Sequence, residues 1–176
     1  RRMLKSAKDR GLCRAIVVNK IDHEGPDLAR LLDSLRASFG PELLPLNLPV
    51  DRGARVVDCF GADAAGSDVA SDVGPVGEWH QKILVQVVEV NETVMDHYLD
   101  LGEGGLSGDE LHDAFEQCLR EGHLVPVCFA SAKANVGVRK LLDVAARLLP
   151  HPGVANPAPF VKGTRDGAKP TAATAA

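Results

Sequence analysis

Residues 16–22 read Ile-Val-Val-Asn-Lys-Ile-Asp, a short apolar run that ends in the pattern Asn19-Lys20-x-Asp22. An apolar run of this length before polar residues predicts a buried strand with a loop at its carboxyl end. In an open α/β sheet, ligands bind in the crevice outside the carboxyl ends of the strands. We therefore expect Asn19, Lys20 and Asp22 to face a ligand-binding crevice.

The residue types in this loop suit a flat ligand with a hydrogen-bonding edge. A carboxylate such as Asp22 accepts two parallel hydrogen bonds from a planar N–H/NH2 edge, which guanine presents and adenine does not. The apolar stem of Lys20 can lie along a flat ring, and the amide of Asn19 can tie one loop to another. The four-residue motif alone is equally compatible with a plain surface turn, so its structural context decides.

A second loop supplies that context. Residues 124–130 form another apolar run, followed by Ser131-Ala132-Lys133 and then a helical pattern. A strand with N-K-x-D followed by a strand with S-A-K resembles the GTPase superfamily. The resemblance implies that the backbone N–H of Ala132 meets the guanine O6 and that the Ser131 side chain supports its loop. The candidate base-binding residues are Asn19, Lys20, Asp22, Ser131, Ala132 and Lys133.

Further segments resemble the translational GTPase elongation factor G and its paralogues. The sequence is more similar to the elongation factor G-like paralogues than to the standard factor. The segments are residues 41–60, with Leu-Asn-Leu-Pro at 46–49 and Val-Val-Asp at 56–58, residues 78–81 with Glu-Trp-His-Gln, and residues 128–138. The resemblance runs from Arg1 to about Phe160. It implies an α/β fold: the C-terminal part of a P-loop GTPase domain, a parallel sheet with flanking helices, carrying a small α+β insertion.

This resemblance divides the chain into four parts. Residues 1–40 are expected to hold the N-K-x-D loop, residues 41–122 the insertion called G-prime, residues 123–150 the S-A-K loop, and residues 151–176 a linker with a disordered tail. In the family, the block matching 41–122 contacts the ribosomal stalk protein. The implied ligands and partners are therefore GTP or GDP, Mg²⁺ in the full-length parent, and the ribosome.

Three departures from the family pattern concern the second loop and the insertion. The family often has Gly where this chain has Ala130, and often an aromatic residue where it has Lys133; both leave the backbone donor in place. The insertion is shorter or looser around 61–77, which weakens the expected stalk-protein contact.

Another translational GTPase, of the release-factor or ribosome-protection type, stays an alternative. A non-catalytic protein-interaction module is the other alternative.

Composition and charge argue against several other classes of protein. The 176 residues carry a formal charge of −4 with a pI near 5.9, which argues against a chain that coats nucleic acid. The four cysteines form no C-x-x-C pair, so neither a zinc site nor a disulfide framework is expected. No run of 18 apolar residues predicts a membrane span, and the cytoplasm is the expected compartment.

The chain contains no G-x-x-x-x-G-K-S/T loop, and no D-x-x-G precedes the first base loop. GTP hydrolysis needs a phosphate cradle, Mg²⁺ ligands and a positioned water. Because the chain also begins at Arg1 rather than Met, we expect a fragment with the base-reading half of a GTPase site and no catalytic residue. The chain alone should not hydrolyse GTP, whereas its full-length parent should.

Local patterns predict the remaining elements. We expect a helix over 3–10, a helix opened by Pro26 with an apolar stripe to Phe39, paired strands over 43–50 and 55–60, and a flexible loop over 61–77. One long helix is expected over 79–98, and a capping box at Ser107 and Glu110 opens the next. Pro126 favours an edge position or a strand start for 124–130. The closing helix, 135–149, should face inward with Leu141, Leu142, Ala145, Leu148 and Leu149.

Overall fold

Strand β7 (Val125–Ala130) is the middle strand of a three-stranded parallel sheet in the order β1-β7-β2. The computed structural model describes residues 2–25, 27–61, 64–150, 160–161 and 172–173. Strand β1 (Ile16–Asn19) pairs with one edge of β7, and β2 (Leu43–Pro45) pairs with the other. The edge position expected from Pro126 is wrong. The strand-start alternative holds, because Pro126 is the second residue of β7.

The apolar run over 43–50 is two strands rather than the single one expected. Strand β2 ends at Pro45 and joins the parallel sheet, whereas β3 (Asn47–Val50) forms an antiparallel hairpin with β4 (Arg55–Asp58). Leu46 is the junction, since its N–H donates to the Val127 carbonyl and its own carbonyl accepts from Cys59 N, both at 3.0 Å. The chain therefore leaves the sheet at Leu46 without leaving the core.

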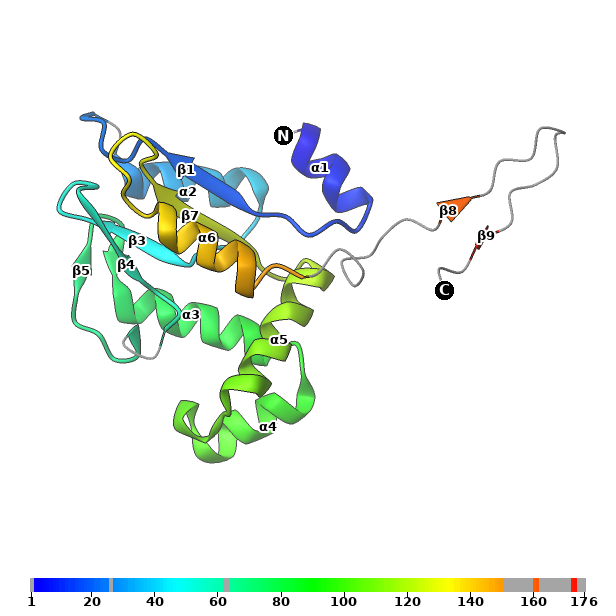
Figure 1. The fold of residues 1–176 in the computed structure, drawn as a ribbon. Helices are drawn as coiled ribbons and strands as arrows, with labels where there is room; N and C mark the ends of the chain where they lie inside the picture. Colours follow the sequence, from blue (N-terminus) through cyan, green and yellow to red (C-terminus); the bar gives the residue numbers. More distant parts are fainter. Residues whose placement is uncertain (1, 26, 62–63, 151–159, 162–171, 174–176) are drawn as a thin grey trace, which may run out of the picture.

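Helices α2 (Leu28–Phe39) and α6 (Val138–Arg147) lie on opposite faces of the sheet (Figure 1). Helix α2 begins at Leu28 because the Asp27 carboxylate accepts a hydrogen bond from Arg30 N at 3.0 Å. Pro26, the expected opening residue, lies outside the described residues. Gly40 ends the helix as predicted. Of the expected stripe, Leu31 is partly exposed.

Helix α6 begins three residues later than predicted, because Asn135 and Gly137 have φ angles of 55° and 70° and cannot continue a right-handed helix. Leu141 and Val144 face inward from the helix, and Leu148 and Leu149, which follow its last residue, also pack against the core. The expectation that Leu142 and Ala145 face inward is wrong, since Leu142 is 62% exposed and Ala145 is exposed. These two residues lie one position beyond the i, i+3, i+7 stripe.

Helix α1 (Arg2–Asp9) precedes β1 and ends near Gly11, whose φ is 64°, as the sequence predicts. None of its residues is buried. The predicted linker and tail over 151–176 lie mostly outside the described residues. Within them, β8 (Phe160–Val161) and β9 (Ala172–Ala173) form a short antiparallel pair.

The rest of the chain forms a helical block below the sheet in Figure 1. It contains the small strands β5 (Ala70–Ser71) and β6 (Gly74–Pro75), where a flexible loop was expected, and then α3 (Val76–Val88). The indole N–H of Trp79 on α3 donates to the Val73 carbonyl at 3.1 Å, which holds the hairpin against the helix.

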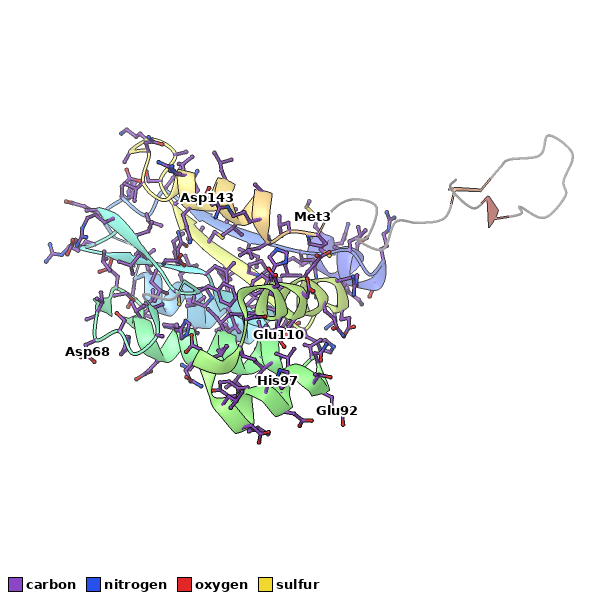
Figure 2. All side chains as sticks on the ribbon, turned by 60° about the horizontal axis from the view of Figure 1, so that its bottom comes forward. Met3, Asp68, Glu92, His97, Glu110 and Asp143 are labelled. Carbon is purple, nitrogen blue, oxygen red and sulfur yellow. The ribbon has the colours of Figure 1, made fainter. Side chains whose placement is uncertain are left out.

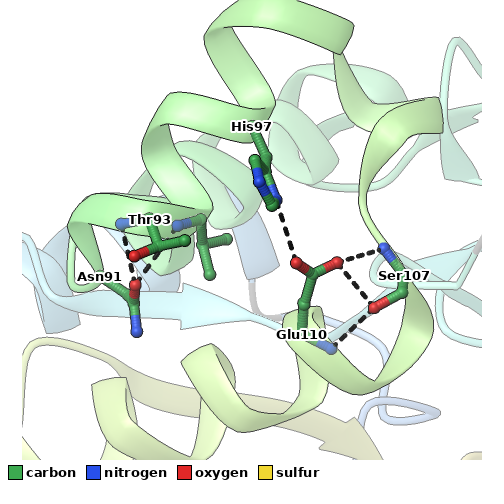
Figure 3. Close-up of polar contacts among 6 residues, drawn as sticks. Asn91, Thr93, His97, Ser107 and Glu110 are labelled. Carbon is green, nitrogen blue, oxygen red and sulfur yellow. Dashed lines mark hydrogen bonds and ion pairs between the residues drawn. The ribbon is translucent and has the colours of Figure 1, made fainter.

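The predicted long helix over 79–98 is interrupted. Helix α3 ends at Val88 and α4 (Glu92–Leu101) begins after Asn91. The Asn91 side chain accepts hydrogen bonds from Thr93 N and Val94 N, which caps a new helix (Figure 3). A 3-10 turn η2 (Glu103–Gly105) then leads to α5 (Gly108–Glu121), and the predicted capping box at Ser107 and Glu110 is confirmed.

One continuous apolar core joins the sheet to the helical block. Phe129 on β7, Leu48 on β3, Ile83 on α3 and Phe115 on α5 are fully buried members of the same cluster. The four cysteines are free thiols, and Cys13 is the only one that is not buried. Within the described ranges, no helix is long and apolar enough to cross a membrane.

Candidate functional site

The two candidate loops adjoin because their strands are parallel neighbours. Asn19, the last residue of β1, stands beside Ala130, the last residue of β7. The chain continues from these positions into the N-K-x-D and S-A-K loops, so both emerge at the same end of the sheet. The Ile21 N–H also donates to the Ala130 carbonyl at 3.3 Å, which extends the contact beyond the strands. The juxtaposition expected from the sequence is therefore present.

The Asn19 side chain ties the two loops together. Its Oδ1 accepts a hydrogen bond from Lys20 N at 2.8 Å and another from Ala132 N at 3.0 Å. Lys20 has a φ of 67°, a left-handed conformation that turns the chain sharply after the strand. The loop-to-loop role anticipated for the Asn19 amide is thus seen in its geometry.

The Asp22 carboxylate is exposed at the end of the first loop. The Ser131 hydroxyl donates a hydrogen bond to it, which is the main reason that the pKa of Asp22 lies below its ordinary value; the nearby Lys133 ammonium lowers it further. Asp22 is therefore an ionised, acceptor-only group at neutral pH. A carboxylate in this state can accept two hydrogen bonds from a planar donor edge.

Ser131 is the buried member of the site. Its side chain is inaccessible to solvent, and its Oγ also accepts from Ala134 N at 3.1 Å. Ser131 and Val136 exchange two backbone hydrogen bonds, of 2.8 and 3.0 Å, which close the second loop. Ser131 therefore links Asp22 of the first loop to a rigid turn in the second.

Ala132 and Lys133 are exposed on the outer side of this turn. The Ala132 N–H, assigned to the guanine O6 by the resemblance, donates to Asn19 Oδ1 in the structure. An N–H shared between two acceptors is a common three-centre arrangement. A base oxygen could thus approach Ala132 N without breaking the tie between the loops.

A polar hollow of about 660 Å³ has Asp22 in its wall. Its walls include Ile21 and Asp22 of the first loop together with Arg52 and Asp72 of the segment that follows β2. In the described part of the chain, no group of three or more His, Cys, Asp or Glu side chains is placed to hold a metal ion. Among the described residues, the site therefore offers hydrogen-bonding groups and no cluster of metal ligands.

Sequence reasoning missed Asn47 as a contributor to the site. This residue is completely buried, and its side-chain amide bonds both backbone groups of Phe129, two residues before Ser131. The available signal was a polar residue inside the apolar run over 43–50, since a buried amide must find hydrogen-bond partners. The sequence does not show which partners it finds.

Comparisons with known proteins relate the chain to a family and to a solved structure. A family described as "Elongation factor Tu GTP binding domain" matches residues 1–151. A protein of Thermus thermophilus, known from a crystal structure, superposes with a TM-score of 0.69 at 32% sequence identity. The match covers 86% of this chain and 24% of the Thermus chain, so this chain spans about a quarter of that protein's length.

Proposed function

The chain belongs to the elongation factor Tu GTP binding domain family, and from this premise we propose that its two adjoining loops bind the guanine base of GTP or GDP. The observation that carries the proposal is the bond between Asn19 Oδ1 and Ala132 N, which joins the N-K-x-D and S-A-K loops into one site. Membership of the family implies a translational GTPase domain and guanine nucleotide as its ligand.

Each candidate residue has a distinct role in this proposal. Asp22 accepts two hydrogen bonds from the guanine N1–H and N2–H2 groups, and the hydrogen bond from Ser131 orients its carboxylate. The Lys20 stem covers one face of the base. Ala132 N donates to the guanine O6, and Lys133 adds positive charge beside Asp22. A hydrogen bond to a charged group contributes about 1.5–3 kcal/mol, so Asp22 should dominate base selectivity.

The residues of this chain bind and orient the base, while the phosphate chemistry needs other groups. Mg²⁺ and a phosphate-binding loop stabilise the charge that develops during GTP hydrolysis, and the 176 residues contain no G-x-x-x-x-G-K-S/T loop. We infer that GTP hydrolysis belongs to the full-length parent. The chain alone should release no phosphate from GTP above a buffer blank.

Within the translational GTPases, we propose an elongation factor G-like protein that acts on the ribosome in the cytoplasm. Support comes from the segments at 46–49, 56–58 and 78–81 and from the helical block between the two base loops. We propose that residues 41–122 are the G-prime insertion and its surface for the stalk protein, between G-domain parts 1–40 and 123–150. The first strand of this block, β2, belongs to the common sheet.

Base selectivity tests the proposal directly. Asp22→Asn replaces an acceptor-only carboxylate with a group that has one acceptor and one donor, which matches xanthine better than guanine. In the full-length parent, the variant should prefer XTP over GTP, whereas wild type prefers GTP. Asp27→Asn is the matched control, because Asp27 caps helix α2 and Asn caps equally well. An Asp22→Asn protein that still prefers GTP would show that Asp22 does not read the base.

A further inference from the structure

The β3–β4 hairpin contacts both base loops from the side of the helical block. We propose that this hairpin controls the retention of guanine nucleotide by holding the two loops at a fixed spacing, with Asn47 and Gly53 as positioning residues. The proposal rests on the proposed function, since it presumes that the two loops bind the base. It adds a part of the protein outside the candidate loops to the determinants of nucleotide affinity.

Asn47 holds the strand that leads into the second loop. Its Nδ2 donates to the Phe129 carbonyl at 2.9 Å, and the Phe129 N–H donates to its Oδ1 at 2.7 Å. The side chain thus pairs with Phe129 as a backbone residue of a neighbouring strand would. Because both partners are buried, water cannot replace these bonds if Asn47 is lost. The position of β7 just before Ser131 therefore depends on Asn47.

Strand β4 supports the far side of the same loop. A Cβ atom added at Gly137 would lie 3.3 Å from a Val56 methyl group and 2.5 Å from the Phe129 carbonyl oxygen, so β4, β7 and the end of the loop are in close contact. Asp58, the last residue of β4, forms an ion pair with Lys140 on helix α6. The hairpin therefore contacts the chain both before and after the second loop.

The tip of the hairpin reaches the first loop. Asp51, Arg52 and Gly53 have φ angles of 56°, 58° and 76°, a run of left-handed residues that folds the tip sharply. A Cβ atom at Gly53 would lie 2.0 Å from the Ile21 carbonyl oxygen and 2.6 Å from its carbonyl carbon. Ile21 stands between Lys20 and Asp22 in the motif, so only glycine allows the tip to lie this close to the first loop.

Asp72 fixes the tip in this position. Its carboxylate accepts hydrogen bonds from Gly53 N at 2.8 Å and Arg52 N at 3.2 Å, and its own N–H donates to the Pro49 carbonyl at 2.8 Å. Asp72 lies in the turn between β5 and β6, and helix α3 follows directly after β6. The tip is therefore held by Asp72 of the helical block as well as by contacts within the hairpin.

These contacts predict how nucleotide retention responds to changes in the hairpin. A loosened hairpin lets the two loops separate, which shortens the time the base stays bound. The groups that identify the base, above all the Asp22 carboxylate, are unchanged. Variants of the hairpin should therefore speed nucleotide release without altering the preference for guanine, whereas Asp22→Asn alters that preference.

The test compares Gly53→Ala and Asp72→Ala with Asp68→Ala in the full-length parent. Asp68 is an exposed carboxylate at the periphery of the same segment and is the matched control (Figure 2). Dissociation of a fluorescent GDP analogue, measured by stopped flow, should be at least tenfold faster in the first two variants and unchanged in Asp68→Ala. Asp72→Asn, which keeps one acceptor oxygen, should fall between wild type and Asp72→Ala.

A second measurement separates positioning from general loss of stability. In ¹⁵N spectra of the 176-residue chain, Gly53→Ala should shift the Lys20, Ile21 and Ala132 amide signals while signals from helices α4 and α5 stay in place. Asn47→Ala should do the same for Ala132, provided that it folds; Gly53→Ala and Asp72→Ala decide the question if it does not. Folded variants with wild-type GDP release would overturn the inference. A wild-type parent without guanine preference would instead refute the proposed function.

Discussion

Asn19 Oδ1 accepts a hydrogen bond from Ala132 N at 3.0 Å, although the two residues are 113 positions apart in the chain. The bond forms only because β1 and β7 are parallel neighbours that end side by side. The proposed base site therefore requires both loops. It forms only when the long segment between the loops folds so that β7 pairs with β1.

Removal of the Asn19 acceptor should weaken nucleotide binding. Asn19→Ala loses the bonds from Lys20 N and Ala132 N, and a neutral hydrogen bond contributes about 0.5–1.5 kcal/mol. We expect the Kd of the full-length parent for GDP to rise by roughly tenfold, measured by fluorescence titration. Asn19→Asp keeps an acceptor oxygen and should retain most of the affinity. Equal losses in the two variants would show that the tie between the loops is not responsible.

The ion pair between Asp58 and Lys140 should stabilise the fold in a pH-dependent way. Burial raises the pKa of Asp58, but the hydrogen bond and charge of Lys140, with the Phe60 N–H, outweigh burial and hold the pKa below its ordinary value of 3.8. A carboxyl group whose pKa is lower in the folded state contributes stability above its unfolded pKa and loses it as the pH falls through the folded pKa. The pair is partly exposed, so its contribution is about 1 kcal/mol or less.

We therefore expect Lys140→Met to lower the free energy of unfolding near neutral pH and to differ less from wild type below pH 3.8. Urea unfolding of the 176-residue chain at several pH values measures this difference. Arg139→Met removes a neighbouring exposed cation on the same helix and should leave the pH profile unchanged. A constant gap between wild type and Lys140→Met down to the lowest pH would contradict the assignment to Asp58.

The sequence predicts where the two candidate loops lie, because each follows a short apolar run and the two strands are parallel neighbours that end side by side. It does not predict that residues 43–50 divide at Leu46, because a continuous apolar run has the same appearance whether its strand stays in one sheet or enters a second. The partners of Asn47 are equally hidden, since Phe129 lies 82 positions away. These features depend on tertiary pairing rather than on local pattern.

Two predictions about helices were wrong although single residues in the sequence mark the true helix boundaries. The regular spacing of apolar residues hid both of these signals. Apolar residues continue at helical spacing across Asn91, yet Asn is among the strongest helix-capping residues, and it starts a new helix here. In the closing helix, Asn135 and Gly137 delay the first turn until Val138. The stripe that faces the sheet therefore includes Val144 and excludes Leu142.

One of the four thiols should react in the native chain. Burial raises the pKa of Cys59 and Cys118 to about 12 and that of Cys128 to about 11, and all three side chains are shielded. Cys13 is partly exposed, and its pKa is raised less strongly by burial. DTNB should therefore titrate one thiol in buffer and four in denaturant. Cys13→Ser should abolish the native reaction; a remaining fast thiol would mean that one of the buried strands or helices opens readily.

The capping box of helix α5 should contribute measurably to stability. Ser107 Oγ accepts from Glu110 N at 3.2 Å, and the Glu110 carboxylate accepts from Ser107 N at 2.9 Å and from its hydroxyl at 2.7 Å (Figure 3). These bonds are the main reason that the pKa of Glu110 is lowered, and His97 on helix α4 contacts the same carboxylate at 3.0 Å. The box thus fixes the start of α5 and, through His97, its contact with α4.

Ser107→Ala should lower the free energy of unfolding by about 1 kcal/mol, the usual cost of losing a helix cap. Ser6→Ala is the matched control, because Ser6 is exposed within helix α1, where alanine favours the helix slightly. Urea unfolding of both variants, followed by circular dichroism, measures the difference. Ser107→Ala removes both bonds that involve the Ser107 hydroxyl, to the Glu110 N–H and to the Glu110 carboxylate, and leaves the bond from Ser107 N. The Glu110 carboxylate is then held less firmly, so its contact with His97 should loosen and the His97 ring signals in NMR spectra should shift. An unchanged midpoint together with unshifted His97 signals would show that the helical block is held by its apolar core alone.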